Sequence, residues 1–362
     1  MQTDSSQTDI QKLLTSTPPA FTADEAVSIA ASHYGIRAQV RPLVSDRDQN
    51  FRLDADDGKQ YVLKISNYTE QFQFIDFQNC ALLHVSKQDP TFPSPRVIPT
   101  LERQLHCSAR YGGNTHYVRV LSWLDGLVLD EVKSEPGLVN QLGRLLARLG
   151  LALKDFEHPG SNPPSAWDMK QAASLQELLV YVEDPVIRQL TEQTLDRFLT
   201  RVKPVLDTLR TQVIYNDMNL GNVLMDKAQP DRISGLIDFG DLVKSPLIID
   251  LAIAAAYQLG EGDDPLAGAL PMIAGYHAIR PLQETEIHLL TDLIRTRLIT
   301  SLLIGSYRSN LFPENKEYIL ISHDPAKRAL IGLDGLDSEA AFDRIRLFLQ
   351  GGHSWPKPVT PQ

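Results

Sequence analysis

The sequence predicts an α+β fold of two lobes: a small antiparallel sheet that carries one helix, and a larger helical lobe with an inserted β element. Two observations predict this division. Strand-like apolar runs bounded by turn residues fill most of residues 38–121, whereas apolar residues recur at helical spacing through most of residues 127–350. Between residues 213 and 237, short apolar runs interrupt the helical spacing. A chain of 362 residues is long enough for both lobes.

The first lobe is expected over residues 21–121, after a lead-in over residues 1–20 that is rich in Ser, Thr, Gln and Pro and is expected to be disordered. Thr22 and Glu25 have the spacing of a capping box, and Gly35 can end the following helix in the left-handed conformation. The elements after that helix are expected to be strands 40–44, 50–54 and 60–65, helix 74–86, and strands 104–110 and 115–121.

The second lobe is expected over residues 127–350, after a hinge at residues 122–126 and before a tail at residues 351–362. Apolar residues at helical spacing predict helices over residues 139–156, 172–182 and 185–209. The inserted β element consists of three apolar runs, at residues 213–215, 223–225 and 233–237.

The composition is that of a globular enzyme, with 43% hydrophobic and 22% charged residues. A formal net charge of -10, without clustered Lys and Arg, excludes nucleic acid and anionic membranes as partners. The longest apolar stretch, residues 246–257, contains Asp250 and is shorter than the roughly 20 residues that span a bilayer. Cys80 and Cys107 are the only cysteines and no signal peptide is recognised, so we expect a cytoplasmic protein, either a monomer or a homodimer.

The inserted β element carries the side chains best suited to chemistry. Asp217 and Asn222 lie in the loop between its first two strands, and Asp238 ends the third. Phosphoryl transfer needs oxygen ligands for Mg²⁺ and a carboxylate that orients the attacking hydroxyl. Asp217 therefore suits the base, and Asn222 and Asp238 suit the metal. The alternative interpretation makes the loop residues turn formers and Asp238 a helix cap.

Lys64 is the candidate contact for the nucleotide phosphates. It lies in the apolar strand 61–65, where alternation places Lys64 on the opposite face from Leu63 and Ile65. An exposed strand lysine without a functional role is the alternative. The apolar strand and the downstream metal-binding pattern favour the phosphate contact.

At this point the chain resembles the aminoglycoside phosphotransferase and choline kinase superfamily, whose members are relatives of the protein kinases. Within it, the chain resembles most closely the 5-hydroxylysine kinase group. The resemblance extends from Val44 to Tyr318 and implies a bilobal protein-kinase-like fold and a phosphotransferase with an alcohol group as acceptor. The segments that carry it are residues 48–51 (DQNF), 61–67 (YVLKISN), 152–156 (ALKDF), 216–219 (NDMN) and 233–241 (ISGLIDFGD).

The resemblance also implies roles for individual residues. Asp217 is the implied catalytic base, Asn222 and Asp238 hold Mg²⁺, and Lys64 contacts the phosphates of ATP or GTP. The loop over residues 44–51 covers the phosphates, but it lacks the glycines of protein kinases. The remaining nucleotide contacts are then expected from Ser45 and Asn50 in that loop and from Ser122, Trp123 and Leu124, whose backbone receives the purine.

Three positions bear on the resemblance. Tyr215 stands where the superfamily commonly has His, two residues before the base. The helix glutamate that pairs with the strand lysine in kinases has no clear counterpart, and both Gln78 and Asp76 stay open as the partner of Lys64. Asp250 resembles the family's buried aspartate that braces the catalytic loop.

The expected acceptor is a hydroxylated amino acid, hydroxylysine first. Its amines and carboxylate call for acidic groups and an arginine near the base, and the candidates are Asp241, Trp167, Asp168 and Arg297. Aminoglycosides, homoserine, and choline or ethanolamine are alternative acceptors. A hypothesis of another class is a nucleotide-binding pseudokinase with a regulatory role, which Tyr215 and the unassigned lysine partner motivate.

Overall fold

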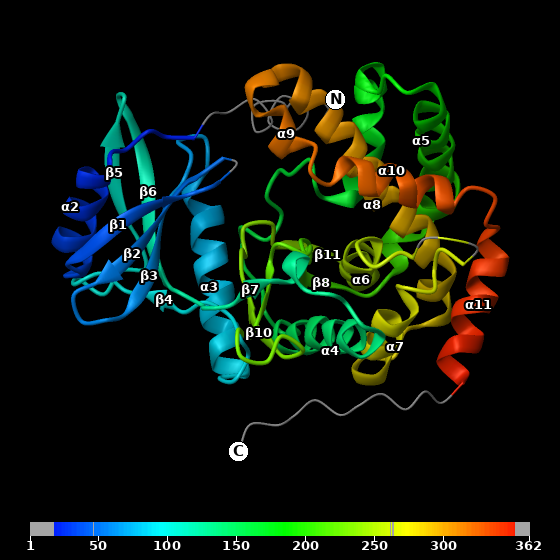
Figure 1. Cartoon of the computed structure of the whole chain (residues 1–362), viewed down its shortest axis with the longest axis horizontal. Helices are drawn as coiled ribbons and strands as arrows, with labels where there is room; N and C mark the ends of the chain where they lie inside the picture. The colour runs from blue at the N-terminus through cyan, green and yellow to red at the C-terminus, as the bar shows by residue number, and fades with distance from the viewer. Residues whose placement is uncertain (1–17, 46, 261, 263, 352–362) are drawn as a thin grey trace.

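The computed structural model describes residues 18–45, 47–260, 262 and 264–351. Most of the expected lead-in and nearly all of the expected tail lie outside these described residues. In Figure 1 the sheet with helix α2 (Ala23–Tyr34) lies at one end of the molecule and the helices from α4 (Pro136–Ala152) onward lie at the other. The expected α+β architecture, with an antiparallel sheet and a helical part, is confirmed.

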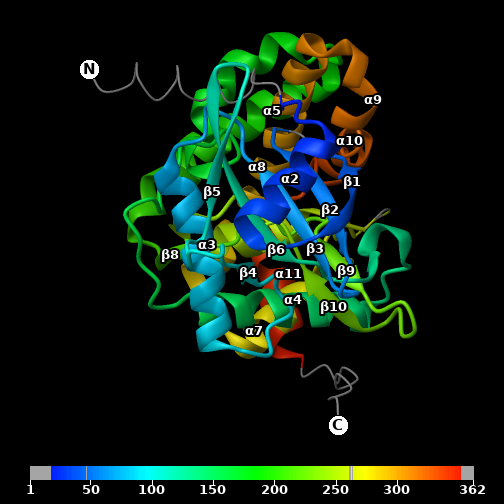
Figure 2. The ribbon, with the colours of Figure 1, turned by 90° about the vertical axis from the view of Figure 1, so that its left-hand side faces the viewer.

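The main sheet is antiparallel and has the strand order β1-β2-β3-β6-β4, with β5 also paired to β6. Its strands are β1 (Ala38–Leu43), β2 (Gln49–Ala55), β3 (Gln60–Ile65), β4 (Val97–Ile98), β5 (Cys107–Tyr111) and β6 (Asn114–Ser122). Helix α2 covers the outer face of this sheet (Figure 2) and begins with the expected capping box of Thr22 and Glu25. Leu63 and Ile65 pack in the core beneath α2. Lys64 therefore lies on the opposite face, toward the helical part.

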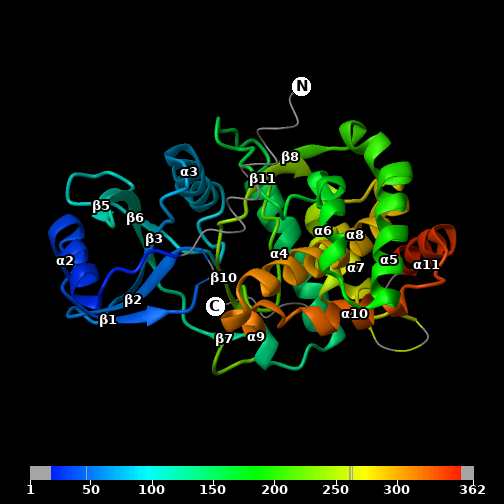
Figure 3. The same ribbon diagram turned by 90° about the horizontal axis from the view of Figure 1, so that it is seen from above.

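Helix α3 (Phe72–Gln88) lies between the sheet and the helical part, as Figure 3 shows from above. Its buried residues Phe77, Ala81 and Leu82 belong to the large core that continues into α4. Contacts made by α3 can therefore reach both the sheet and the helical part.

The helical part is built on α4, α6 (Leu247–Ala256), α7 (Leu270–Ile279) and α8 (Glu284–Leu311). Around them lie the 3₁₀ segment η2 (Met169–Tyr181), α5 (Pro185–Arg197), η5 (Pro313–Asn315), α9 (Lys316–Ile319), α10 (His323–Gly332) and α11 (Ser338–Gln350). The predicted continuous helix 185–209 is wrong beyond Arg197. There the chain forms the π-helix Phe198–Val202 and the 3₁₀ turn Lys203–Thr208, because Pro204 lacks the N–H that a continuing α-helix needs.

The inserted β element is two separate ribbons. Strand β8 (Thr211–Ile214) pairs with β11 (Val243–Pro246), while β9 (Val223–Met225) pairs with β10 (Ile233–Leu236) and with β7 (Leu127–Val128), which follows the expected hinge. The loop from β8 to β9 and the loop from β10 to β11 therefore both cross from one ribbon to the other. These two loops carry Asp217 and Asp238. Within the described residues, none of the helices combines the length and apolarity that crossing a membrane demands.

Candidate active site

The loop after β8, called here the catalytic loop (residues 215–222), is held by a carboxylate of α6. Asp250 accepts hydrogen bonds from the backbone N–H of Tyr215 at 3.2 Å and of Asn216 at 2.8 Å. Asn216 has a φ of 67°, in the left-handed region that non-glycine residues seldom adopt. The contacts expected of a bracing aspartate are present. They fix the backbone immediately before Asp217.

Two amides fix the side chain of Asp217. Asn219 Nδ2 donates to both carboxylate oxygens at 3.1 Å, and Asn222 Nδ2 donates to Asp217 Oδ2 at 2.6 Å and to its backbone oxygen at 3.0 Å. Because the amide nitrogen of Asn222 faces Asp217, its amide oxygen points away from that carboxylate. Burial raises the pKa of Asp217, and the nearby carboxylate of Asp241 raises it further, whereas Arg297 lowers it. A carboxylate with a raised pKa is a stronger base toward a hydroxyl group.

The loop after β10, called here the metal loop (residues 237–241), lies against the catalytic loop. Ile237 N donates to Asn222 O at 2.9 Å, so Asp238 follows directly on a residue bonded to Asn222. The hydroxyl group of Tyr215 donates to the backbone oxygen of Ile237, and its ring packs edge-on against Phe239 with 5.2 Å between centroids. Tyr215 thus ties the two loops together, which is a structural role for the residue that departs from the superfamily's histidine.

Lys64 reaches this pair of loops from the sheet. Its Nζ lies 3.2 Å from Asp238 Oδ1, which also accepts the N–H of Gly240 at 3.2 Å. The charge of Lys64 is the first cause of a lowered pKa of Asp238. Among the described residues the ion-pair partner of Lys64 is therefore Asp238, and neither Gln78 nor Asp76 holds that place. Gln78 bonds Arg119 and Gly240 instead.

Asp76 belongs to another cluster, with Cys80 and His158, in which the potential ligand atoms lie within 4.8 Å of one another. His158 Nδ1 accepts the N–H of Gly160 at 3.0 Å, so the neutral ring carries its proton on Nε2 and donates it to Asp76 at 3.2 Å. That hydrogen bond accounts for the cluster without a metal ion.

Arg297 of α8 is the cation next to Asp217. Its side chain is only 4% exposed, and its Nη2 donates to Tyr257 Oη at 2.9 Å and lies 3.5 Å from Asp217 Oδ1. The guanidinium lies over the ring of the partly exposed Trp167, 4.8 Å from its centroid. Its Nε and Nη1 are buried and have no hydrogen-bond partner among the described residues. Buried donors of a charged group left unpaired are costly, so an anion that reached this edge of Arg297 would be stabilised there.

Asp168, which follows Trp167 in the chain, makes contacts of its own. Asp168 caps the segment η2 by accepting the N–H of Lys170 at 3.1 Å, and pairs with the Lys170 ammonium group at 3.4 Å, so its carboxylate is already engaged. The structure thus assigns Asp168 a structural contact. Asp241 does lie close enough to Asp217 for their charges to interact.

The candidates for nucleotide binding lie in or near the main sheet and in the segment directly after β6. Asn50 is the cross-strand partner of Lys64 and shares its face, and its Oδ1 is buried with no hydrogen-bond partner in the part of the chain that the structure describes. Ser122 Oγ accepts the N–H of Arg96 at 2.8 Å, and Trp123 N donates to Gln60 O at 3.1 Å. Ser45 precedes residue 46, which lies outside the described residues, and Leu124 approaches Gly235.

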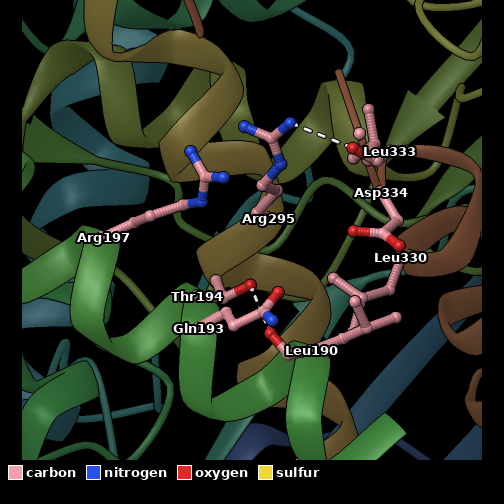
Figure 4. Close-up of a pocket in the computed structure, with 9 residues that line it drawn as sticks. Leu190, Gln193, Thr194, Arg197, Arg295, Leu330, Leu333 and Asp334 are labelled. Carbon is pink, nitrogen blue, oxygen red and sulfur yellow. Dashed lines mark hydrogen bonds between the residues drawn. The ribbon is translucent and has the colours of Figure 1, made fainter. Parts of the chain in front are cut away.

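Tyr257, the partner of Arg297, was missed by the sequence analysis. It follows Asp250 by two helical turns, so their shared helix face was a usable signal. Figure 4 shows a separate hollow, lined by Leu190, Arg197, Arg295 and Leu333 among others, with a volume of about 20 Å³. Arg295 Nη2 donates there to the carbonyl of Leu333 at 3.0 Å. The hollow has room for little more than a water molecule, so it is no acceptor site.

A sheet that presents a lysine to two loops rich in carboxylate and amide groups is the arrangement of a kinase-like phosphotransferase. The sequence comparison agrees: the chain belongs to the phosphotransferase enzyme family, whose model matches residues 39–282.

Among individual proteins, the chain is 29% identical to hydroxylysine kinase of Mus musculus, over 85% of this chain and 88% of that protein. It is 27% identical to hydroxylysine kinase of Danio rerio, over 86% and 91%. The solved structure of amicoumacin kinase with AMP-PNP and Ca²⁺ superposes with a TM-score of 0.64 at 15% identity, over 83% of this chain and 93% of that one. The predicted family resemblance and kinase-like fold are confirmed. The chain is a small-molecule kinase, an alcohol-acceptor phosphotransferase with a nucleotide donor.

Proposed function

We propose that this kinase transfers the γ-phosphate of ATP or GTP to the side-chain hydroxyl of a hydroxylated amino acid, hydroxylysine first. The observation that carries the proposal is the buried, unpaired edge of Arg297 beside Asp217. An acceptor with a carboxylate would satisfy those donors while its hydroxyl group approaches the base. The hydroxylysine kinases that match most of the chain support the same acceptor.

The donor set near Asp217 fits Mg²⁺. Asp238 keeps one carboxylate oxygen beyond its bonds to Lys64 and Gly240, and the amide oxygen of Asn222 points away from Asp217. Carboxylate and amide oxygens are ligands that Mg²⁺ accepts. The ion would neutralise charge on the phosphates when bound.

Asp217 is the proposed base. Asn219 and Asn222 orient its carboxylate, which accepts the proton of the acceptor hydroxyl as the oxygen of that hydroxyl attacks the γ-phosphorus. The bond from the γ-phosphorus to its bridging oxygen breaks, and ADP or GDP leaves. Lys64 shifts from Asp238 toward the phosphates, with Asn50 beside it on the same face of the sheet. The backbone of Ser122, Trp123 and Leu124 receives the purine.

Arg297 and Asp241 are the proposed acceptor contacts, Arg297 for the carboxylate and Asp241 for an amine. Trp167 covers the guanidinium, so its ring moves aside when the acceptor enters. Intrinsic fluorescence of the few tryptophans would report that movement on acceptor binding. We place the enzyme, as a monomer or homodimer, in a reducing cytoplasm, which suits the free thiols of Cys80 and Cys107.

An acceptor panel tests the proposal. We expect Mg²⁺-dependent turnover with hydroxylysine and ATP or GTP, and none with lysine, which differs only by the missing hydroxyl group. Homoserine, ethanolamine, choline and an aminoglycoside complete the panel. Faster turnover of an acceptor without a carboxylate would overturn the amino-acid assignment. Nucleotide binding without turnover of any acceptor would favour the pseudokinase.

A further inference from the structure

Arg119 is a buried cation that the catalytic roles above leave unused. It lies on β6 directly opposite Lys64 of β3 and is 2% exposed. Its Nη1 donates to Asn79 Oδ1 at 3.2 Å and its Nη2 donates to Gln78 Oε1, while its Nε has no hydrogen-bond partner in the described ranges of the chain. Like charges directly opposite one another on a sheet repel, and both amide contacts are neutral. Within the described residues, the guanidinium of Arg119 thus has no carboxylate in hydrogen-bond contact.

Gln78 joins this cation to the metal loop. While its Oε1 accepts from Arg119, its Nε2 donates to the backbone oxygen of Gly240 at 3.1 Å. An amide can accept and donate at once, whereas a carboxylate can only accept. A glutamate in the place of Gln78 would pair with Arg119 but would turn an oxygen toward the Gly240 carbonyl. The amide is therefore the side chain that this position requires.

The same contact explains why Lys64 pairs with Asp238. Helix α3 presents an amide at Gln78, and its Asp76 is bonded to His158, so neither competes for the ammonium group. The charge of Arg119 interacts with nearby carboxylates, Asp48 first, but makes no ion pair with them; it lies beside Lys64 on the neighbouring strand and adds positive potential where anionic phosphates are expected. This face of the sheet thus carries two cations: Lys64, which is proposed to move toward the phosphates, and Arg119, which Gln78 and Asn79 hold in place.

We propose that Gln78 and Arg119 are positioning residues for nucleotide binding: Gln78 holds the metal loop to helix α3, and Arg119 fixes Gln78 and supplies positive charge beside Lys64. The inference rests on the proposed phosphate role of Lys64 but not on the identity of the acceptor. It predicts an effect on the nucleotide that is separate from any effect on the acceptor.

Gln78→Glu is the decisive variant, with Gln73→Glu as its matched control. Gln73 lies on the same helix, is exposed, and bonds only the side chain of Gln71 among the contacts described, so the control adds the same charge away from Arg119. Binding of AMP-PNP with Mg²⁺ is measured by calorimetry without any acceptor, and thermal unfolding is followed in parallel. We expect Gln78→Glu to weaken AMP-PNP binding roughly tenfold or more, because its contact with the Gly240 carbonyl becomes repulsive. The new ion pair with Arg119 offsets the cost of that contact, so the melting temperature should stay near the wild-type value. Gln73→Glu is expected to bind like the wild type.

Arg119 is tested by the pair Arg119→Lys and Arg119→Met. The lysine variant keeps the charge and is expected to retain AMP-PNP affinity within about threefold, whereas the methionine variant loses roughly tenfold. Unchanged AMP-PNP binding in Gln78→Glu would overturn the proposal. It would also be overturned if both Arg119 variants lost AMP-PNP affinity equally and in proportion to their fall in melting temperature. Because no acceptor is present, a wrong acceptor assignment would leave these results untouched and would appear only in the acceptor panel.

Discussion

Replacement of Arg297 by methionine tests the recognition of the acceptor carboxylate. Methionine keeps an apolar stem to lie against Trp167 but removes the guanidinium. In the wild type, no described residue bonds the buried Nε and Nη1 donors, so an acceptor carboxylate gains charged hydrogen bonds of about 1.5–3 kcal/mol each. Taking about 3 kcal/mol, we expect the wild type to prefer hydroxylysine over its carboxamide by roughly 150-fold in kcat/KM.

The assay measures the wild type and Arg297→Met with both hydroxylysine and its carboxamide. Any effect of the substitution on the pKa of Asp217 then cancels in the ratio of the two acceptors. Arg297 lowers the pKa of Asp217, and its removal therefore raises that pKa and slows both acceptors near neutral pH. The ratio of kcat/KM between hydroxylysine and its carboxamide is free of this effect. We expect the ratio to fall below about fivefold in Arg297→Met, because the charged hydrogen bonds to the carboxylate are gone. A variant that keeps the wild-type ratio would refute the carboxylate contact.

Three further predictions concern the bracing aspartate, the helix packing and the metal. Asp250→Asn should lower the unfolding free energy by about 2 kcal/mol, because an NH₂ group then faces a backbone N–H of the catalytic loop. Burial raises the pKa of Asp250 to about 6, so its protonated form stabilises the fold and that contribution fades as pH rises from about 4 to about 6. In denaturant titrations, the difference in unfolding free energy between the wild type and Asp250→Asn should therefore become smaller over this pH range. A difference that does not change with pH would contradict the raised pKa of Asp250. Gly143→Ala should lower the unfolding free energy by about 3 kcal/mol, since its Cβ would lie 2.0 Å from a carbonyl oxygen of α7. The control Gly332→Ala, whose Cβ would lie 3.7 Å from its nearest neighbour, should be neutral or slightly stabilising. Equal effects of the two changes would argue against close packing of α4 on α7. Asp238→Asn should raise the Mg²⁺ concentration for half-maximal activity at least about tenfold, and an unchanged requirement would remove Asp238 from the metal.

The parts of the fold that depend on local patterns were predictable from the sequence. Thr22, Glu25 and Gly35 define the first helix through neighbours a few residues away, and strand alternation places Lys64 on the correct face of its strand. The positions of Asp217 in a loop between two strands and of Asp238 just after a third followed from short apolar runs separated by polar turn residues. Each of these features is set by contacts close in sequence, where apolar spacing and capping chemistry are informative.

The features that depend on long-range pairing were not predictable. Strand β11 is four residues long, contains Lys244 and runs directly into the apolar helix α6, so no alternation marks it. Its pairing with β8 splits the expected β element into two ribbons. The contact of Gln78 with Arg119 joins residues 41 positions apart. The cap that Asp168 forms for η2 was likewise not anticipated, because the sequence offers a substrate contact and a helix cap equally for this carboxylate.

The most direct test of the phosphotransferase mechanism is Asp217→Asn under saturating nucleotide, Mg²⁺ and hydroxylysine, with product followed by phosphorus NMR. Asp207→Asn, a matched change at an exposed position, is the control. Loss of a general base should slow formation of phosphorylated hydroxylysine by about 10²–10⁴-fold, while AMP-PNP binding and thermal unfolding stay at wild-type values. The control should keep wild-type turnover. An Asp217→Asn enzyme that retains more than about a tenth of wild-type turnover would contradict the assignment of Asp217 as the base.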